Sequence, residues 1–208
     1  MRLLADAYAR AGFTAYVPDL LHGDALPISF LQAVEPPLKV RLQLSAEEVA
    51  KNGAELGATF MPWLGRHPED TVRAEIDGFV KAVRAIEGTR KVGAVGFCWG
   101  GRYAILLAGE GADAAYACHP SLTGIPDYEA VNKPLALAVG EKDSMLDMET
   151  VERIKEALEK RDAPTEVRVY EDQVHGFTIR GDWSSDKDQK AMDDSLKQGI
   201  AWFDKYLA

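Results

Sequence analysis

Cysteine is scarce in this sequence, which has only Cys98 and Cys118 among its 208 residues. Two cysteines cannot form a disulfide framework, and their separation does not fit a C-x-x-C motif. Free thiols are typical of a reducing compartment. We therefore expect a cytoplasmic protein in which Cys98 is an unpaired thiol.

Long hydrophobic runs and basic clusters are also missing. No apolar stretch approaches the roughly 18 residues that a membrane-spanning helix needs, and Asp6 and Arg10 interrupt the N-terminal segment before it could act as a secretion signal. The formal net charge of −9 disfavours nucleic acid or an anionic membrane as a partner. An anionic substrate would need a local arginine.

Histidine is rare, and none of the four histidines has a partner at helical i, i+4 spacing. Such paired histidines are a frequent signature of a metal site. We therefore expect no metal site. No other cofactor is expected either.

The composition, with 47% hydrophobic and 27% charged residues, is typical of a folded globular domain. We expect residues 1–208 to form one domain, in which residues 20–67 are a connection or lid. Prolines interrupt this region, and only residues 45–48 resemble the start of a short capped helix. Strands are predicted at 13–17, 92–95, 113–118, 134–139 and 165–170, and helices at 1–11, 68–88, 103–108, 147–160 and 186–207.

Alternating strands and helices predict an α/β fold with a mostly parallel sheet and helices on both faces. The strand at 134–139 is apolar on both faces, as expected of a parallel strand covered by helices. In such sheets the ligand binds at the carboxyl ends of the strands. Residues directly after each strand are therefore the candidates for function.

The segment 96–100, G-F-C-W-G, joins a predicted strand to a helix. It matches the G-x-S-x-G nucleophile elbow, with Cys98 in the serine position. Such a turn would expose the sulfur above a helix N-terminus, which stabilises a thiolate. The backbone N–H of Trp99 would donate to an oxyanion. The alternative is a buried structural cysteine in a glycine-rich turn.

Two later strands are each followed by a residue that could complete a catalytic triad. Asp143 and His175 come after Cys98 in the order nucleophile, acid, histidine, as in the α/β-hydrolases. His175 would accept the thiol proton and Asp143 would orient the imidazole. Glu141 and Asp147 are alternatives for the acid.

The remaining histidines have weaker claims. His119 follows a strand and is the main rival to His175, although its position before the acid makes it a candidate for the pocket wall or for a residue behind it. His22 and His67 lie in the connecting region and are expected at the surface or in the lid.

Four segments resemble those of the dienelactone hydrolase family: 16–23 (Y-V-P-D-L-L-H-G), 96–101 (G-F-C-W-G-G), 140–143 (G-E-K-D) and 175–177 (H-G-F). The resemblance extends along essentially the whole chain. It implies an α/β-hydrolase fold and a carboxymethylenebutenolidase-like enzyme that hydrolyses small esters or lactones. Cys98, Asp143 and His175 would then act through a thioacyl intermediate.

The resemblance also implies a substrate carboxylate that is held by arginines. Arg180, shortly after the triad histidine, is the nearest match, whereas Arg66 and Arg102 are weaker candidates. His119 and Phe177 are further candidates for substrate binding.

The sequence departs from the family pattern at its start, because strands normally precede the helix that here begins at Met1. The loop after the last of those strands supplies a second oxyanion donor and a glutamate that contacts the nucleophile. We expect that the strand at 13–17 pairs with the one at 92–95, that another chain completes the sheet in an oligomer, or that Met1 is an internal methionine.

Two other functions remain open from the sequence. The first is a weakly active or inactive relative that binds a ligand or partner through the same pocket. The second is a redox-sensing thiol protein, which is disfavoured because no resolving cysteine lies at an obvious spacing.

Overall fold

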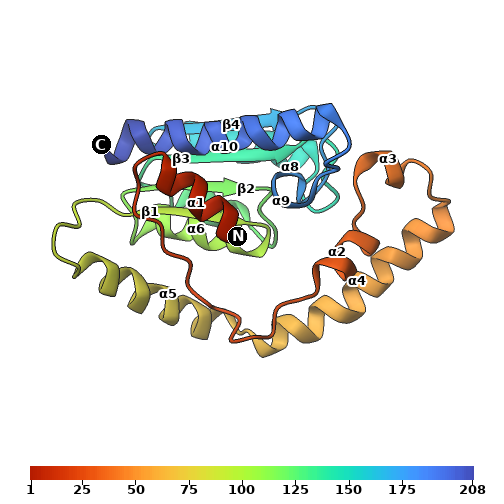
Figure 1. The fold of residues 1–208 in the computed structure, drawn as a ribbon, viewed down its shortest axis with the longest axis horizontal. Coiled ribbons are helices and arrows are strands. Elements are labelled where there is room, and N and C mark those ends of the chain that lie inside the picture. The colour runs from red at the N-terminus through yellow and green to blue at the C-terminus, as the bar shows by residue number, and fades with distance from the viewer. The chain divides into compact units, whose positions relative to one another are not determined.

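The computed structural model describes residues 1–208, which form two compact units, Met1–Phe79 and Val80–Ala208 (Figure 1). The boundary between the units falls within helix α5 (Glu69–Arg84). No helix combines the length and the hydropathy that crossing a membrane requires.

The unit Val80–Ala208 contains a four-stranded parallel sheet in the order β1-β2-β3-β4. The predicted α/β class with a parallel sheet is confirmed, and each strand lies within two residues of its predicted position. The strands are β1 (Gly93–Phe97), β2 (Ala114–Cys118), β3 (Leu135–Gly140) and β4 (Thr165–Tyr170).

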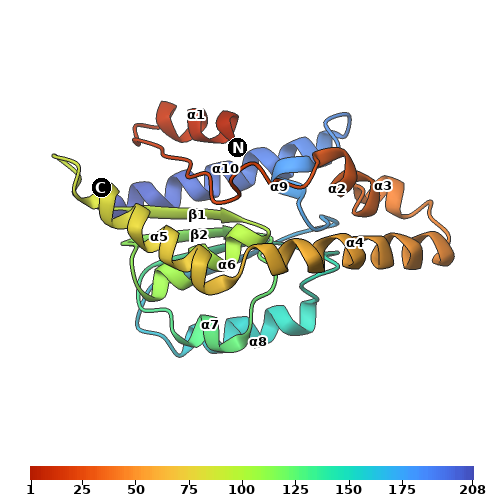
Figure 2. The same ribbon diagram turned by 90° about the horizontal axis from the view of Figure 1, so that it is seen from below.

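Helices cover both faces of this sheet, as the sequence predicts. Figure 2 shows α6, α7 and α8 on one face and α10 on the other. Helix α8 begins after Asp147, whose side chain accepts a hydrogen bond from the backbone N–H of Thr150 and so caps the helix. The helices are α6 (Trp99–Gly109), α7 (Ile125–Glu129), α8 (Met148–Glu159), α9 (Phe177–Arg180) and α10 (Asp186–Leu207).

The two central strands make up most of the core, because every residue of β2 and β3 is buried. Alternate residues of a strand point to opposite faces, so a strand that is covered on both faces needs apolar residues throughout. The core between the sheet and the helices α6 to α8 includes Ile105, Leu135, Leu137, Val139, Ile154 and Leu158.

Strand β1 forms one edge of the sheet and pairs only with β2. Its Val95 is 38% exposed, in contrast to the buried central strands. The predicted strand at 13–17 and its pairing with β1 are wrong, because that segment forms no regular secondary structure. The unit Met1–Phe79 contains no strand with which the backbone of 13–17 could form a ladder.

The unit Met1–Phe79 is entirely helical and contains α1 to α4 and most of α5. The predicted short helix at 45–48 is instead the first turn of α4, which has 21 residues and accommodates Pro62. The predicted capping box is present, since Ser45 and Glu48 each bond the backbone N–H of the other. The helices are α1 (Arg2–Arg10), α2 (Ile28–Val34), α3 (Leu38–Arg41) and α4 (Ala46–Arg66).

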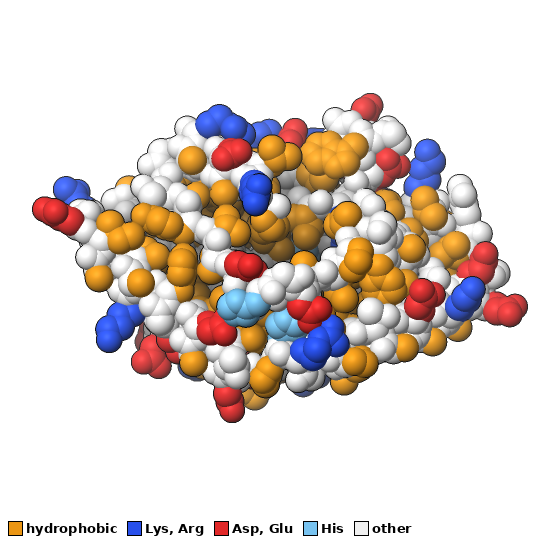
Figure 3. Space-filling model, turned by 60° about the horizontal axis from the view of Figure 1, so that its bottom comes forward, with side chains coloured by type: hydrophobic (Ala, Val, Ile, Leu, Met, Phe, Trp, Pro, Cys, Tyr) orange, Lys and Arg blue, Asp and Glu red, His pale blue; other side chains and the backbone are white.

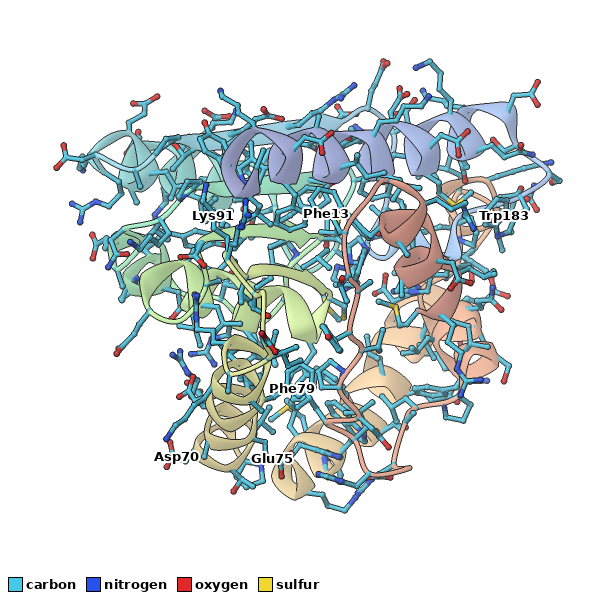
Figure 4. All side chains as sticks on the ribbon, turned by 60° about the vertical axis from the view of Figure 1, so that its left-hand side comes forward. Phe13, Asp70, Glu75, Phe79, Lys91 and Trp183 are labelled. Carbon is cyan, nitrogen blue, oxygen red and sulfur yellow. The ribbon has the colours of Figure 1, made fainter.

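Side-chain contacts join the irregular segments of this unit to its helices. Figure 4 shows Phe79 on α5, where it makes an edge-to-face contact with Tyr16 at a ring separation of 6.4 Å. On the same helix, Glu75 accepts a hydrogen bond from His22 at 3.0 Å. Many hydrophobic side chains nevertheless reach the surface of the molecule, as Figure 3 shows for one of its faces.

Candidate active site

Each strand of the sheet is followed by a residue that the sequence singles out. Cys98 follows β1, His119 follows β2, Asp143 lies after β3, and His175 lies after β4. Because all four strands are parallel, their carboxyl ends lie at one edge of the sheet. The structure brings these four residues together.

Cys98 has the strained backbone of a nucleophile elbow, with φ of 52° and ψ of −121°, and directly precedes α6. The turn depends on close backbone contacts at two glycines. A methyl carbon on Gly96 would lie 2.0 Å from the carbonyl oxygen of Gly100, and one on Gly101 would lie 2.9 Å from the Cα of Pro120. Gly100 itself has open space around it. The second glycine that the turn needs is therefore Gly101, one residue beyond the motif.

The side chains of Cys98, His175 and Asp143 form a continuous chain of contacts. The Nε2 atom of His175 lies 3.1 Å from the sulfur of Cys98. The Nδ1 atom of His175 lies 3.0 Å from Oδ2 and 3.1 Å from Oδ1 of Asp143. Because a carboxylate accepts hydrogen bonds, Nδ1 carries a proton and Nε2 faces the thiol.

The other two candidates for the acid have different partners. Asp147 caps helix α8, and Glu141 accepts a hydrogen bond from the backbone N–H of Asp172 at 3.0 Å. Asp143 is the acid that contacts His175, and it is buried with that histidine.

The pKa values of the sulfur and the imidazole move in opposite directions. Burial raises the pKa of Cys98, but the hydrogen bond to His175 and weaker ones from Ser121 and the Trp99 backbone lower it overall. Burial lowers the pKa of His175, but its hydrogen bonds with Asp143 and Cys98 outweigh this and raise it to about 10. Both shifts favour a thiolate–imidazolium pair.

His119 contacts the backbone of the nucleophile and not its sulfur. Its Nδ1 atom accepts a hydrogen bond from the N–H of Cys98 at 3.2 Å, and its Nε2 atom lies 2.7 Å from the hydroxyl of Thr178. Nδ1 is therefore unprotonated and Nε2 carries the proton. Burial, together with nearby His175 and Arg180, holds the pKa of His119 well below its ordinary value. The ring thus serves as a neutral support behind the nucleophile.

Arg180 lies directly behind the loop that carries His175. It is buried on α9, and a methyl carbon on Gly176 would lie 2.3 Å from its Nε atom. Gly176 has a φ of 82°, a conformation that glycine adopts without strain. The guanidinium therefore fits here because residue 176 has no side chain.

The other two arginine candidates are engaged in ion pairs. Arg102 lies 3.1 Å from Asp127, and Arg66, in the unit Met1–Phe79, lies 2.8 Å from Asp24. Arg180 is the candidate that contacts the loop of the triad histidine, at Gly176.

Phe177 is almost completely buried. Its ring packs against Tyr170, with 4.9 Å between centroids, and against His119 at 5.9 Å. These contacts hold α9 against the sheet. Substrate binding by Phe177 remains a prediction.

Two hydroxyl residues contact the site although the sequence did not single them out. Thr178 bonds His119, and the hydroxyl of Ser121 lies 3.7 Å from the sulfur of Cys98. Their positions in the sequence give weak signals, since each lies within three residues of a candidate histidine. No group of three or more His, Cys, Asp or Glu side chains is arranged to hold a metal ion.

Known proteins resemble this chain in sequence. The family model described as the dienelactone hydrolase family matches residues 1–207. The protein named hydrolase tropI from Talaromyces stipitatus is 27% identical over 208 residues, which are 99% of this chain and 75% of that protein. A carboxymethylenebutenolidase homolog from Mus musculus is 25% identical over 210 residues, which are 99% of this chain and 76% of that protein.

Solved structures support the same fold. A dienelactone hydrolase from Anabaena variabilis matches 99% of this chain and 78% of its own, with a TM-score of 0.60 and 18% identity. A structure from Klebsiella pneumoniae, provisionally named a dienelactone hydrolase, has a TM-score of 0.60 and 25% identity. It covers 69% of this chain, whereas this chain covers 64% of it, less than two thirds. Because the family model spans nearly every residue, the chain belongs to the dienelactone hydrolase family.

Proposed function

We propose that this protein is a cysteine-dependent hydrolase of small carboxylic esters or lactones. The observation that carries the proposal is the chain of contacts from the sulfur of Cys98 through His175 to Asp143, with separations of 3.1 and 3.0 Å. A nucleophile, a base and an orienting acid in this order are the elements of covalent acyl transfer.

In the first half of the reaction, the Cys98 thiolate attacks the carbonyl carbon of the substrate. A C–S bond forms, and the carbonyl oxygen becomes an oxyanion to which the backbone N–H of Trp99 can donate. When the C–O bond breaks, the imidazolium of His175 gives its Nε2 proton to the departing oxygen. The product is a thioester on Cys98, and a lactone ring has been opened.

In the second half, neutral His175 accepts a proton from a water molecule, which attacks the thioester carbon. The C–S bond breaks, the acid is released, and the Cys98 thiolate again pairs with imidazolium. Asp143 keeps Nδ1 protonated in both halves, so that Nε2 alone exchanges protons.

We further propose that the substrate carries a carboxylate and that Arg180 contributes to its binding. Arg180 is adjacent to the loop of His175, and a relative named for carboxymethylenebutenolidase supports a lactone of this class. The unpaired, ionisable thiol of Cys98 is consistent with a reducing, cytoplasmic location.

The test is hydrolysis of p-nitrophenyl acetate and of a dienelactone by the purified 208-residue chain and by Cys98→Ala. We expect the variant to lose activity on both substrates, and mass spectrometry of the wild type to detect an acyl group on Cys98. Equal rates for the two proteins would end the hydrolase proposal and favour a ligand-binding role.

A further inference from the structure

The last residue of β2 and the loop that follows it contact each polar group of Cys98. The N–H of Cys98 donates to the carbonyl of Cys118 at 3.1 Å and to Nδ1 of His119 at 3.2 Å. Its carbonyl accepts from the N–H of Ser121 at 3.1 Å, and its sulfur lies 3.7 Å from the hydroxyl of Ser121. The two backbone contacts fix the position of Ser121 relative to the nucleophile.

The hydroxyl of Ser121 is shielded from water, since the residue is only 2% exposed. A buried hydroxyl is destabilising unless it has a hydrogen-bond partner. Here that partner is the sulfur of Cys98. A neutral thiol is a weak acceptor, whereas a thiolate is a strong one. The environment of Ser121 therefore favours an ionised Cys98.

We propose that Ser121 is a further catalytic residue, whose hydroxyl donates a hydrogen bond to the Cys98 thiolate and increases the fraction of nucleophile that is ionised before acylation. This inference rests on the proposed function. In the thioester the sulfur carries no charge, so the hydrogen bond is strong only in the free enzyme.

The effect of the Ser121 hydroxyl on the ionisation of Cys98 can be separated from that of the ionisable groups around the sulfur. His175 contacts the sulfur directly at 3.1 Å, and its hydrogen bond lowers the pKa of Cys98 more than that of Ser121 does. Asp143 contacts His175, and neutral His119 faces the backbone of Cys98. Arg180 lies beyond them against Gly176. Removing the Ser121 hydroxyl leaves all four of these groups in place.

The experiment measures how fast iodoacetamide alkylates Cys98 at each pH between 4 and 10, in the wild type and in Ser121→Ala. The alkylation rate should rise with pH, and in Ser121→Ala we expect the midpoint of this rise to lie about 0.5 to 1 pH unit higher than in the wild type. At a pH below the midpoints of both proteins, alkylation of the variant should then be roughly three- to tenfold slower. The plateau at high pH should not change. Ser121→Thr keeps a hydroxyl and should restore the wild-type midpoint.

Thr123→Val is the matched control, because it removes from the same loop a hydroxyl that bonds Tyr128 and not Cys98. The alkylation rate of this control should depend on pH in the same way as that of the wild type. If Ser121→Ala loses the native circular dichroism spectrum, Ser121→Gly removes the same hydroxyl and takes its place.

If the pH at which alkylation rises is unchanged in the variants that lack the hydroxyl, the inference is overturned. A loss of alkylation rate that is equal at every pH would also overturn it, because such a loss indicates a structural role for Ser121. Failure of the proposed function would give a different result, because alkylation of the wild type itself would then rise at the pH of an ordinary thiol. Loss of labelling in Cys98→Ser shows that Cys98 is the residue that is alkylated.

Discussion

The two units of this chain differ in how they bury their hydrophobic residues. Of the large hydrophobic side chains that are exposed, nine lie in Met1–Phe79 and four in Val80–Ala208. The helical unit contains no strand of its own, whereas the second unit encloses two fully buried strands. A packed parallel sheet fixes the residues at its strand ends, and the proposed triad lies there.

The largest expected difference between the units concerns their histidines. His175→Ala should reduce kcat/KM for an activated ester by about 10²- to 10⁴-fold, because the thiol loses its proton acceptor. His22→Ala removes an exposed contact with Glu75 and should leave kcat/KM within about twofold. Steady-state kinetics of both variants checks this. Similar losses would show that chemistry depends on the helical unit as well.

The pH dependence of acylation is the next test, since both titrating groups lie in Val80–Ala208. The pKa of Cys98 is below its ordinary 9.0 and that of His175 is raised to about 10, so the reactive ion pair exists between these two values. We expect kcat/KM to rise through the lowered thiol pKa and to fall near pH 10 as the imidazolium deprotonates. A rising limb at or above pH 9 would contradict the ion pair.

Glycine substitutions compare the packing of the two units. Gly96→Ala and Gly101→Ala should each destabilise the protein by about 1–3 kcal/mol, because the added carbon meets backbone. Gly100→Ala is the control, because there is space for a methyl group at Gly100. There is also space at Gly57 in α4, where Gly57→Ala should stabilise the protein by up to about 1 kcal/mol. Urea denaturation measures all four, and a destabilised Gly100→Ala would contradict the contacts.

The smallest expected effect concerns helix caps. Ser45→Ala should cost about 1 kcal/mol of helix stability in α4, because it removes the oxygen that caps the backbone N–H of Glu48. Asp147→Ala should cost a similar amount in α8. Hydrogen exchange of each helix locates the loss. Slower ester hydrolysis in Ser45→Ala would indicate that the helical unit influences the site.

The central strands could be predicted because burial on both faces leaves a continuous apolar run, as in 134–139. Residues 165–170 could be predicted because polar and apolar residues alternate along them. The order of Cys98, Asp143 and His175 indicated the triad because each residue lies just after a predicted strand. The contacts of Ser121 and Thr178 could not be predicted, because a single hydroxyl in a loop forms no pattern. They depend on the positions at which two separate loops meet.

The helical unit was harder to predict for physical reasons. The segment 13–17 has the composition of a strand, but a strand needs a neighbour for its backbone, which composition does not reveal. Helix α4 was underestimated because prolines at 27, 36 and 37 suggested that the whole region 20–67 was broken. Its buried Leu56 and Trp63, two helical turns apart, were the signal for a longer helix.

The contact between Gly101 and Pro120 has a consequence for protein engineering. The turn around Cys98 and the loop after β2 touch without room for an additional carbon atom. Neither loop can be exchanged for that of another hydrolase without its counterpart. Redesign of substrate preference should therefore transplant residues 96–101 and 118–121 as a single cassette and restrict point mutagenesis to the neighbouring loops.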